Sequence, residues 1–311
     1  MLTSLYYTLK PLIPRAVQLA VRRSVTRRRR ERFRHVWPID EGAGNVPEDW
    51  EGWPEGKRFA LVLTHDVDTH RGMDRCLPLM EIEKRLGFRS SFYFVPERYP
   101  VRFDVLQTLE REGFEVGVHG LDHKGNLFRD RKVFQDRATR INRHLKEWGA
   151  VGFRSPCMFH NLDWTHDLEV RYDASTFDTD PFEPQPDGVG TIFPFRVSRK
   201  DGNRGYVELP YTLPQDFTLF VLLGEKTIDI WKRKLDWIAE KGGMALLITH
   251  PDYMEFEGKQ PGREEYPIRY YTEFLEHVRS HFRGSYHPFL PRDLAEWFHG
   301  KQLPHPVRTS W

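Results

Sequence analysis

The stretch "LVLTHDVDTH" at residues 61–70 places two histidines and two aspartates directly after a hydrophobic run. The run is typical of a buried strand, and Asp66 and Asp68 follow it with one valine between them. Because successive side chains of an extended segment point to opposite faces, the two carboxylates should lie on the same side. Carboxylates this close repel each other unless positive charge compensates for them. The crowding therefore favours a functional site over a solvated loop.

Short apolar or β-branched runs recur along the chain, and helical stretches separate several of them. The expected strands cover residues 59–65, 90–96, 114–120, 150–156, 173–177, 205–211 and 243–250, and the expected helices cover 74–87, 103–112, 131–147, 226–241 and 268–281. Strands that alternate with helices pair in parallel, and about seven such units suit an α/β barrel.

Ionisable residues follow the later strands as well. They are His119 and His123, Arg154, Asp173 and His250. In a parallel barrel the carboxyl ends of all strands meet at one rim, where the strand-to-helix loops converge. The sequence therefore predicts that these side chains gather with Asp66 and Asp68.

Composition and length are those of an ordinary globular protein. The chain has 311 residues, of which 39% are hydrophobic and 30% charged. Its two cysteines, Cys76 and Cys157, provide no disulfide framework. We expect one barrel domain at residues 57–300, preceded by a Gly/Pro/Trp-rich linker at 37–56 and followed by a tail at 301–311.

Residues 1–36 hold ten Lys or Arg against one acid, whereas the rest of the chain has 37 basic and 44 acidic residues. This segment also carries regularly spaced apolar residues, so it predicts a basic amphipathic arm. Lys10, Pro11, Pro14 and Arg15 interrupt any run long enough to span a membrane. The charges follow the apolar part, unlike those of a cleavable signal peptide.

Two interpretations of this arm stay open: a solvated basic helix, or an interfacial anchor to an anionic membrane surface. No nucleic-acid partner is expected, because no recognition motif accompanies the charge. The expected localisation is cytoplasmic, and the second interpretation adds peripheral attachment at the inner membrane face.

The stretch "VHGLDH" places His119 and His123 four residues apart, so that both imidazoles could face one metal ion. The pair alone is a weak signal, and one of the two aspartates would supply the third ligand. Two histidines and one carboxylate, with an open position for water, form a common catalytic site for a divalent metal. The other aspartate would then be free to act as a general base.

Five segments resemble, in order and approximate spacing, the five motifs of the polysaccharide deacetylases, carbohydrate esterase family 4. They are "THDVD" (64–68), "HGLDH" (119–123), "FRSP" (153–156), "YDAST" (172–176) and "LLITHP" (246–251). The resemblance covers about residues 57–252. It implies a distorted barrel of seven or eight β/α units and the removal of N- or O-acetyl groups from a sugar or polysaccharide, for example an exopolysaccharide.

The resemblance also implies roles for the polar residues. Asp66 would be the catalytic base and Asp68, with His119 and His123, would hold one divalent metal ion. Zinc is the first choice for that ion, and cobalt, nickel and manganese are the alternatives.

The three later motifs would complete the machinery. Arg154 would pair with the base, His250 would protonate the departing amine, and Asp173 would tune its neighbours. The backbone N–H of Cys157, next to Pro156, would stabilise the oxyanion. Trp164 is either a sugar-stacking element or part of the rim packing.

The chain departs from the family pattern at three places. Val67 separates the two aspartates of the first motif, which are usually adjacent. Cys157 and Met158 stand where a tyrosine and a glycine are usual, and the fourth motif lacks its tryptophan, with Phe177 nearby. The wall of the sugar pocket should therefore differ, so the sequence predicts a carbohydrate carrying an acetamido group but not its identity. The alternatives are allantoinase-like hydrolysis of a cyclic amide and a catalytically silent sugar-binding protein. His65 and His70 are left without a role.

Overall fold

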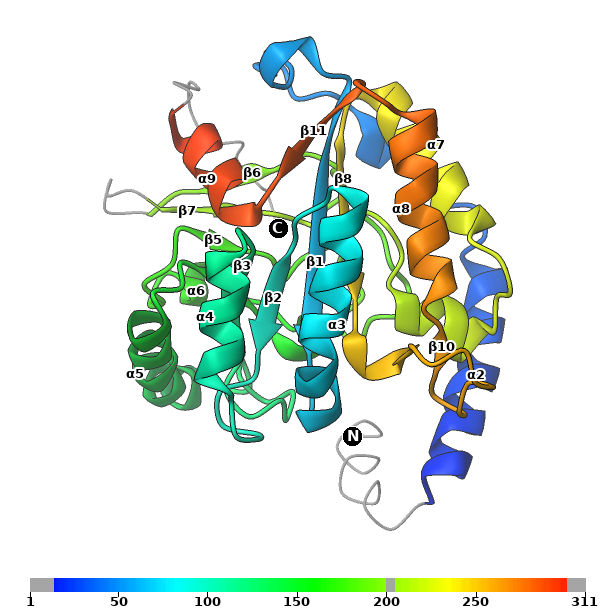
Figure 1. Ribbon diagram of the computed structural model, residues 1–311. Coiled ribbons are helices and arrows are strands. Elements are labelled where there is room, and N and C mark those ends of the chain that lie inside the picture. Colours follow the sequence, from blue (N-terminus) through cyan, green and yellow to red (C-terminus); the bar gives the residue numbers. More distant parts are fainter. Residues whose placement is uncertain (1–13, 200–204, 301–311) are drawn as a thin grey trace.

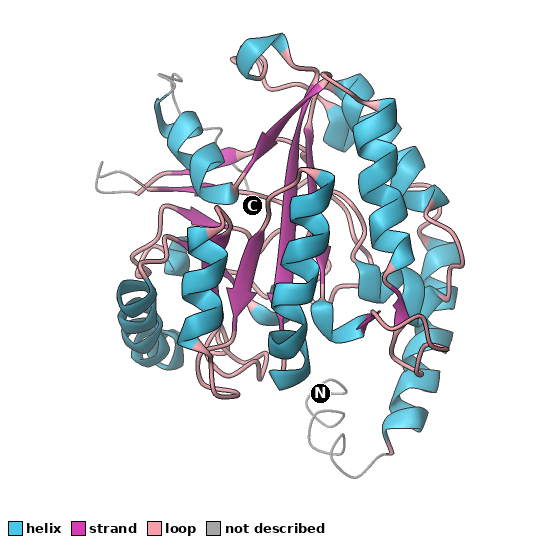
Figure 2. Ribbon diagram, in the orientation of Figure 1, coloured by secondary structure: helices cyan, strands magenta, loops and turns pink. Residues whose placement is uncertain are grey.

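The computed structural model describes residues 14–199 and 205–300. Its centre is a curled nine-stranded sheet with helices around the outside (Figures 1 and 2). The longest strand, β1 (Phe59–Val67), runs through the middle of the molecule. It pairs in parallel with β2 (Ser91–Phe94), β8 (Met244–Thr249) and β11 (Tyr286–Phe289).

The sheet continues from β2 in parallel through four further strands, namely β3 (Glu115–His119), β4 (Gly152–Arg154), β5 (Tyr172–Asp173) and β7 (Tyr206–Glu208). A short antiparallel strand, β6 (Phe195–Val197), pairs with β7 at the edge. Beyond β7, Leu213 forms a parallel bridge with Leu247 of β8. The chain thus returns towards β1, and the predicted distorted barrel is confirmed.

All five predicted helices are present. They are α3 (His70–Leu86), α4 (Phe103–Arg111), α5 (Arg131–Trp148), α7 (Asp229–Lys241) and α8 (Arg269–His281). Helix α3 begins four residues earlier than predicted because the Thr69 hydroxyl caps it, accepting a hydrogen bond from the Arg71 N–H.

Several elements were not predicted. The helical ones are α6 (Leu162–Thr165), α9 (Pro291–Gly300), the π-helix η5 (Phe217–Leu223) and the 3₁₀ turns η2 (Glu41–Gly44), η3 (Pro54–Gly56), η4 (Pro156–Met158) and η6 (Pro251–Tyr253). The basic arm, for which a helix was one of the interpretations, forms α2 (Arg15–Arg32). A small second sheet joins β9 (Met254–Glu255) to β10 (Tyr266–Pro267). Strand β11, "YHPF", was missed because it contains a proline and lacks an apolar run.

Every residue of β1 is buried, as expected for a parallel strand that is covered on both faces. Leu61 and Leu63 belong to the larger apolar cluster, which includes the inner sides of the surrounding helices. Ala60 and Val62 belong to a second cluster, which holds Leu246 and side chains of the other strands. The alternation along β1 therefore separates the two halves of the core.

His65 belongs to a buried polar network beneath α3. Its Nε2 lies 2.9 Å from Oε1 of Glu83, and its Nδ1 lies 2.7 Å from the Thr249 hydroxyl. The hydroxyls of Ser90 and Tyr271 also donate to the Glu83 carboxylate. The network links β1, α3, β8 and α8, so the hydrogen bonds of His65 hold elements of the barrel together.

His70 lies on the surface at the start of α3. Its Nδ1 is 3.1 Å from the carboxylate of Asp74, and both side chains are largely exposed. Neither flanking histidine of the opening stretch therefore joins the ionisable cluster at the end of β1.

The N-terminal part of the described chain lies against the barrel. Helix α2 contacts η5, and the expected linker buries Trp37 and Trp53. Residues 1–13 and 301–311 lie outside the described residues, so the predicted boundaries of arm, linker and tail stay predictions. None of the described helices combines the length and the apolar character needed to cross a membrane.

We predict that Glu83→Ala lowers the free energy of unfolding by about 3–5 kcal/mol, because it leaves several buried polar groups without their partner. Urea denaturation followed by circular dichroism measures the change. The matched control is Glu81→Ala on the exposed face of the same helix, which should alter stability by no more than about 0.5 kcal/mol. Equal effects of the two substitutions would contradict the structural role of the network.

Candidate active site

Asp66, near the end of β1, forms a buried ion pair with Arg154, the last residue of β4. Nη1 of Arg154 lies 2.8 Å from Oδ1 of Asp66, and the guanidinium is fully buried. The same group donates to the Thr64 hydroxyl and to the Ala174 carbonyl, and lies 4.4 Å from the centre of the Tyr93 ring. These contacts fix the direction from which Arg154 reaches the carboxylate.

The charges around Asp66 oppose the effect of its burial. Burial alone would raise its pKa, but the positive charge of Arg154, with smaller contributions from His119 and His250, holds the pKa below the usual value. Asp66 is therefore ionised at neutral pH despite being almost inaccessible to solvent.

Asp68, His119 and His123 form a compact cluster beside this pair. Their ligand atoms all lie within 4.8 Å of one another, and no other such group of three was found in residues 14–199 and 205–300. Oδ1 of Asp68 lies 2.9 Å from Nε2 of His123 and 3.5 Å from Nε2 of His119. Burial would raise the pKa of Asp68, but the two histidines lower it well below the usual value.

The donor set of this cluster fits a divalent metal ion. Nδ1 of His119 lies 3.0 Å from the Arg154 carbonyl, which can only accept a hydrogen bond. Nδ1 therefore carries a proton, and in the neutral ring Nε2 presents its lone pair to the aspartates. Oδ1 of Asp68 is buried, and it has no hydrogen-bond donor among the described residues when Nε2 of both histidines is unprotonated. A cation between these atoms would satisfy it.

His250, directly after β8, is held by a carboxylate that follows β7 in the chain. Nδ1 of His250 lies 2.7 Å from Oδ1 of Asp216, and the His250 N–H donates to Oδ2 of the same residue at 2.7 Å. The Tyr266 hydroxyl donates to Oδ2 as well. Burial would lower the pKa of His250, but Asp216 and the nearby charges of Asp68 and Asp66 raise it to about 10.

Strained backbone surrounds the cluster. Four non-glycine residues among those described have a positive φ, and three of them, His123, Cys157 and Met158, lie in the loops that follow β3 and β4. Pro156 packs against Gly120, where an added Cβ would come within 2.4 Å of the proline Cδ. Cys157, the next residue, is exposed.

Two predicted site residues do not belong to the cluster of Asp68, His119 and His123. Asp173 is buried behind Arg154, where it accepts a hydrogen bond from Ser175, and burial raises its pKa to about 7. Trp164 packs against Phe134, with ring centres 5.8 Å apart, and below the guanidinium of Arg131.

Solved structures provide the comparison with known proteins, because no protein-family model and no curated protein sequence matches the chain. A Mycobacterium smegmatis protein assigned to the polysaccharide deacetylases superposes with a TM-score of 0.62 at 21% identity, over 84% of this chain and 99% of that one. A Pseudomonas aeruginosa PAO1 protein with the same assignment gives 0.59 at 16% identity, over 86% and 99%. This chain has the polysaccharide deacetylase fold.

Puue allantoinase shares this fold. Its TM-score is also 0.62, at 16% identity, over 87% of this chain and 99% of that one. At these identities the likeness shows the polysaccharide deacetylase fold alone, and the chemistry has to be argued from the side chains.

Within the polysaccharide deacetylase fold of this chain, Asp216 is the residue that sequence reasoning missed. The fourth motif directed attention to Asp173, which makes no hydrogen bond to His250. The available signal was an aspartate directly before the apolar run "FTLFVLL" (217–223), where it caps η5 by accepting from the Phe217 N–H. An ionisable group at the start of a buried helix requires a polar partner, and His250 is that partner.

We predict that His250 in metal-free protein titrates at about pH 10 and that Asp216→Asn lowers this pKa by more than one unit. Nitrogen-15 NMR of the imidazole follows the titration. Because the folded-state pKa is raised, the pair stabilises the fold fully below the unfolded pKa of about 6.5 and loses that contribution as the pH rises through about 10. Tyr266→Phe, which leaves the carboxylate in place, should produce a smaller shift. An unchanged His250 pKa in Asp216→Asn would contradict this account.

Proposed function

We propose that the protein is a metal-dependent hydrolase that removes an acetyl group from an N-acetylated sugar. The observation that carries the proposal is the placement of three features around one rim: a buried aspartate paired with an arginine, a metal-type cluster, and a histidine paired with an aspartate. A general base and a general acid must hold opposite protonation states at the same pH, and the surroundings of Asp66 and His250 produce this difference.

Asp68, His119 and His123 would hold the metal ion. Two imidazoles and one carboxylate suit zinc best, with cobalt, nickel and manganese as alternatives. When bound, such an ion lowers the pKa of water and polarises a carbonyl oxygen. The remaining steps belong to the side chains of the protein.

Asp66 would accept the proton of the attacking water. Its second oxygen, Oδ2, lies 3.7 Å from Nε2 of His119, so it faces the metal-type cluster while Oδ1 is held by Arg154. Arg154 keeps the carboxylate ionised and fixes its orientation. Asp173, buried behind Arg154, would act as a supporting residue.

His250 would donate a proton to the leaving nitrogen. Asp216 binds its Nδ1, which leaves Nε2 as the proton donor. The N–H of Cys157, in the turn after Pro156, would bind the oxyanion. The φ of Cys157 is 56°, which is strained for a non-glycine residue, and this strain supports a role for the direction in which its N–H points.

The substrate would be a carbohydrate with an acetamido group, either free, polymeric or linked to a lipid. Hydrolysis of a cyclic amide is the second candidate, because the superposition on Puue allantoinase is as good as that on the Mycobacterium smegmatis protein. A sugar-binding protein without catalysis is less consistent with the site, since binding alone needs neither an ionised base nor a protonated acid.

The metal part of the proposal predicts about one divalent ion per chain in the purified protein, measured by elemental analysis. His119→Ala should lose the ion, because it removes a central ligand. His70→Ala is the matched control, since this exposed histidine lies two residues from Asp68 yet outside the cluster. Full retention of the ion in His119→Ala would disprove the ligand assignment.

The catalytic part predicts acetate release from compounds that contain N-acetylglucosamine. Asp66→Asn should lower kcat by about 10²–10⁴-fold while the ion stays bound, and Asp74→Asn on the exposed face of α3 should leave kcat unchanged. Thermal unfolding shows whether each variant is folded. Ring opening of a cyclic amide without acetate release from any acetylated glycan would favour the second candidate, and a fully active Asp66→Asn would contradict the assigned base.

A further inference from the structure

Helix α2 is fixed to the barrel by its inner face. Leu19 is buried in a small apolar cluster with Phe217, Val221 and Leu222 of η5. Arg23 donates through Nε to the Val221 carbonyl at 2.8 Å. Two ion pairs, Arg15 with Glu264 and Arg30 with Glu225, tie the two ends of the helix to the body of the protein.

The outer face of α2 carries an exposed apolar row. Val17, Val21 and Val25 are 49%, 53% and 45% exposed, and they follow one another at intervals of four residues. Such an interval places side chains on one face of a helix. Among the described residues only two other large hydrophobic side chains, Val46 and Phe103, are comparably exposed.

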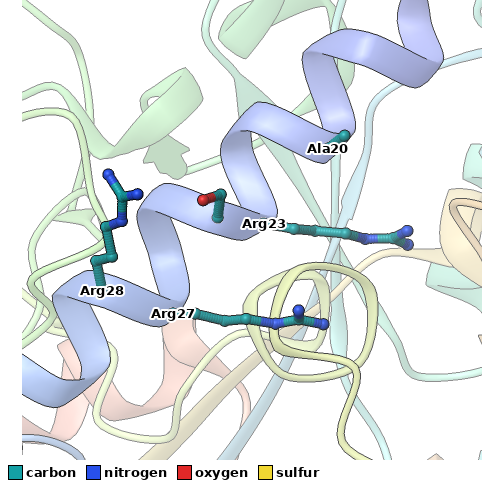
Figure 3. A pocket seen from close by; sticks show the side chains of 5 residues that line it. Ala20, Arg23, Arg27 and Arg28 are labelled. Atoms are coloured by element: carbon teal, nitrogen blue, oxygen red, sulfur yellow. The ribbon is translucent and has the colours of Figure 1, made fainter.

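Arginines flank the valine row. Arg27 and Arg28 are exposed, and neither forms an ion pair with any residue of the described ranges. With Ala20, Arg23 and Ser24 they line an open pocket of about 370 Å³ on the helix surface. Figure 3 shows the side chains of Arg23 and Arg27 extending in the same direction, with Arg28 on the other side of the helix. The pocket has the charge to receive a phosphate group.

We propose that this outer face of α2 docks on an anionic membrane surface. Lipid phosphates would bind Arg27 and Arg28, and the three valines would enter the boundary between headgroups and acyl chains. A nucleic acid would use the arginines but would leave the valine row in water. An exposed valine row with arginines on both sides of the helix, unpaired among the described residues, therefore favours a bilayer.

A chain of side-chain contacts connects helix α2 with the candidate active site. The guanidinium of Arg22 is 4.8 Å from the centre of the Phe217 ring, the Phe217 and Tyr253 rings are 4.7 Å apart, and the Tyr253 and His250 rings are 5.2 Å apart. A docked α2 would thus bring the rim that bears His250 near the headgroups. The favoured substrate is then an acetylated sugar that is anchored in the membrane. This choice of substrate rests on the proposed function, whereas the docking of α2 does not.

Sedimentation of the full chain with lipid vesicles tests the docking. Vesicles of phosphatidylcholine with about one third phosphatidylglycerol should bind the wild type, and vesicles of phosphatidylcholine alone should not. Arg27→Glu/Arg28→Glu should weaken binding at least about 25-fold, because each arginine near an anionic surface contributes about fivefold. Val17→Gln/Val21→Gln/Val25→Gln should weaken vesicle binding about tenfold. The binding that remains in this variant should still weaken as the salt concentration rises, because the arginines are unchanged.

The matched control is Arg85→Glu/Arg111→Glu, which changes the net charge equally on helices α3 and α4 and should bind like the wild type. Circular dichroism and metal content establish that each variant is folded, independently of any activity. Equal loss in the control would mean non-specific charge attraction and would overturn the proposal. The proposal would also be overturned if both α2 variants bound vesicles as tightly as the wild type does. Binding of the wild type to duplex DNA or free phosphate, without binding to vesicles, would overturn it too.

Discussion

The buried ion pair between Asp66 and Arg154 is the interaction on which the site and the barrel both depend. In the sheet, β4 lies three positions from β1, so Arg154 reaches Asp66 only because the sheet curls around its interior. A buried carboxylate without this partner would be neutral or destabilising. The curvature of the sheet and the ionisation of Asp66 therefore depend on each other.

Neighbouring positive charges explain how two aspartates coexist at the end of one strand. Oδ2 of Asp66 and Oδ1 of Asp68 lie 3.7 and 3.5 Å from the same nitrogen of His119, so the single intervening valine leaves both carboxylates on one side. Arg154 compensates for the first charge. The histidines, and a cation in the proposed enzyme, compensate for the second.

Much of this arrangement could be predicted from the sequence, because it depends on local patterns. The apolar runs before Asp66, His119, Arg154 and His250 indicate strands, and parallel strands bring their ends together. Asp216 could not be found in this way, since its contact with His250 arises from η5, a π-helix in an apolar run without helical periodicity. The expected strand at 173–177 ends at Asp173, because Ser175 turns to bond both Asp173 and the Ser155 N–H.

The arginine-rich segment shows a different limit of sequence reasoning. Its charge was evident from composition, but which face of α2 is solvent-exposed depends on its contact with η5. That contact buries Leu19 and leaves the valine row outside. The same η5 carries Phe217, next to Tyr253 and His250, so the arm and the catalytic rim share one structural support.

An anomalous difference map of a crystal of the zinc-loaded protein would locate the metal ion relative to Asp66 and Asp68. We expect one peak within about 2.0–2.2 Å of Nε2 of His119, Nε2 of His123 and a carboxylate oxygen of Asp68, with Asp66 still paired to Arg154. A peak bound by Asp66, or one outside this cluster, would contradict the division of roles between the two carboxylates.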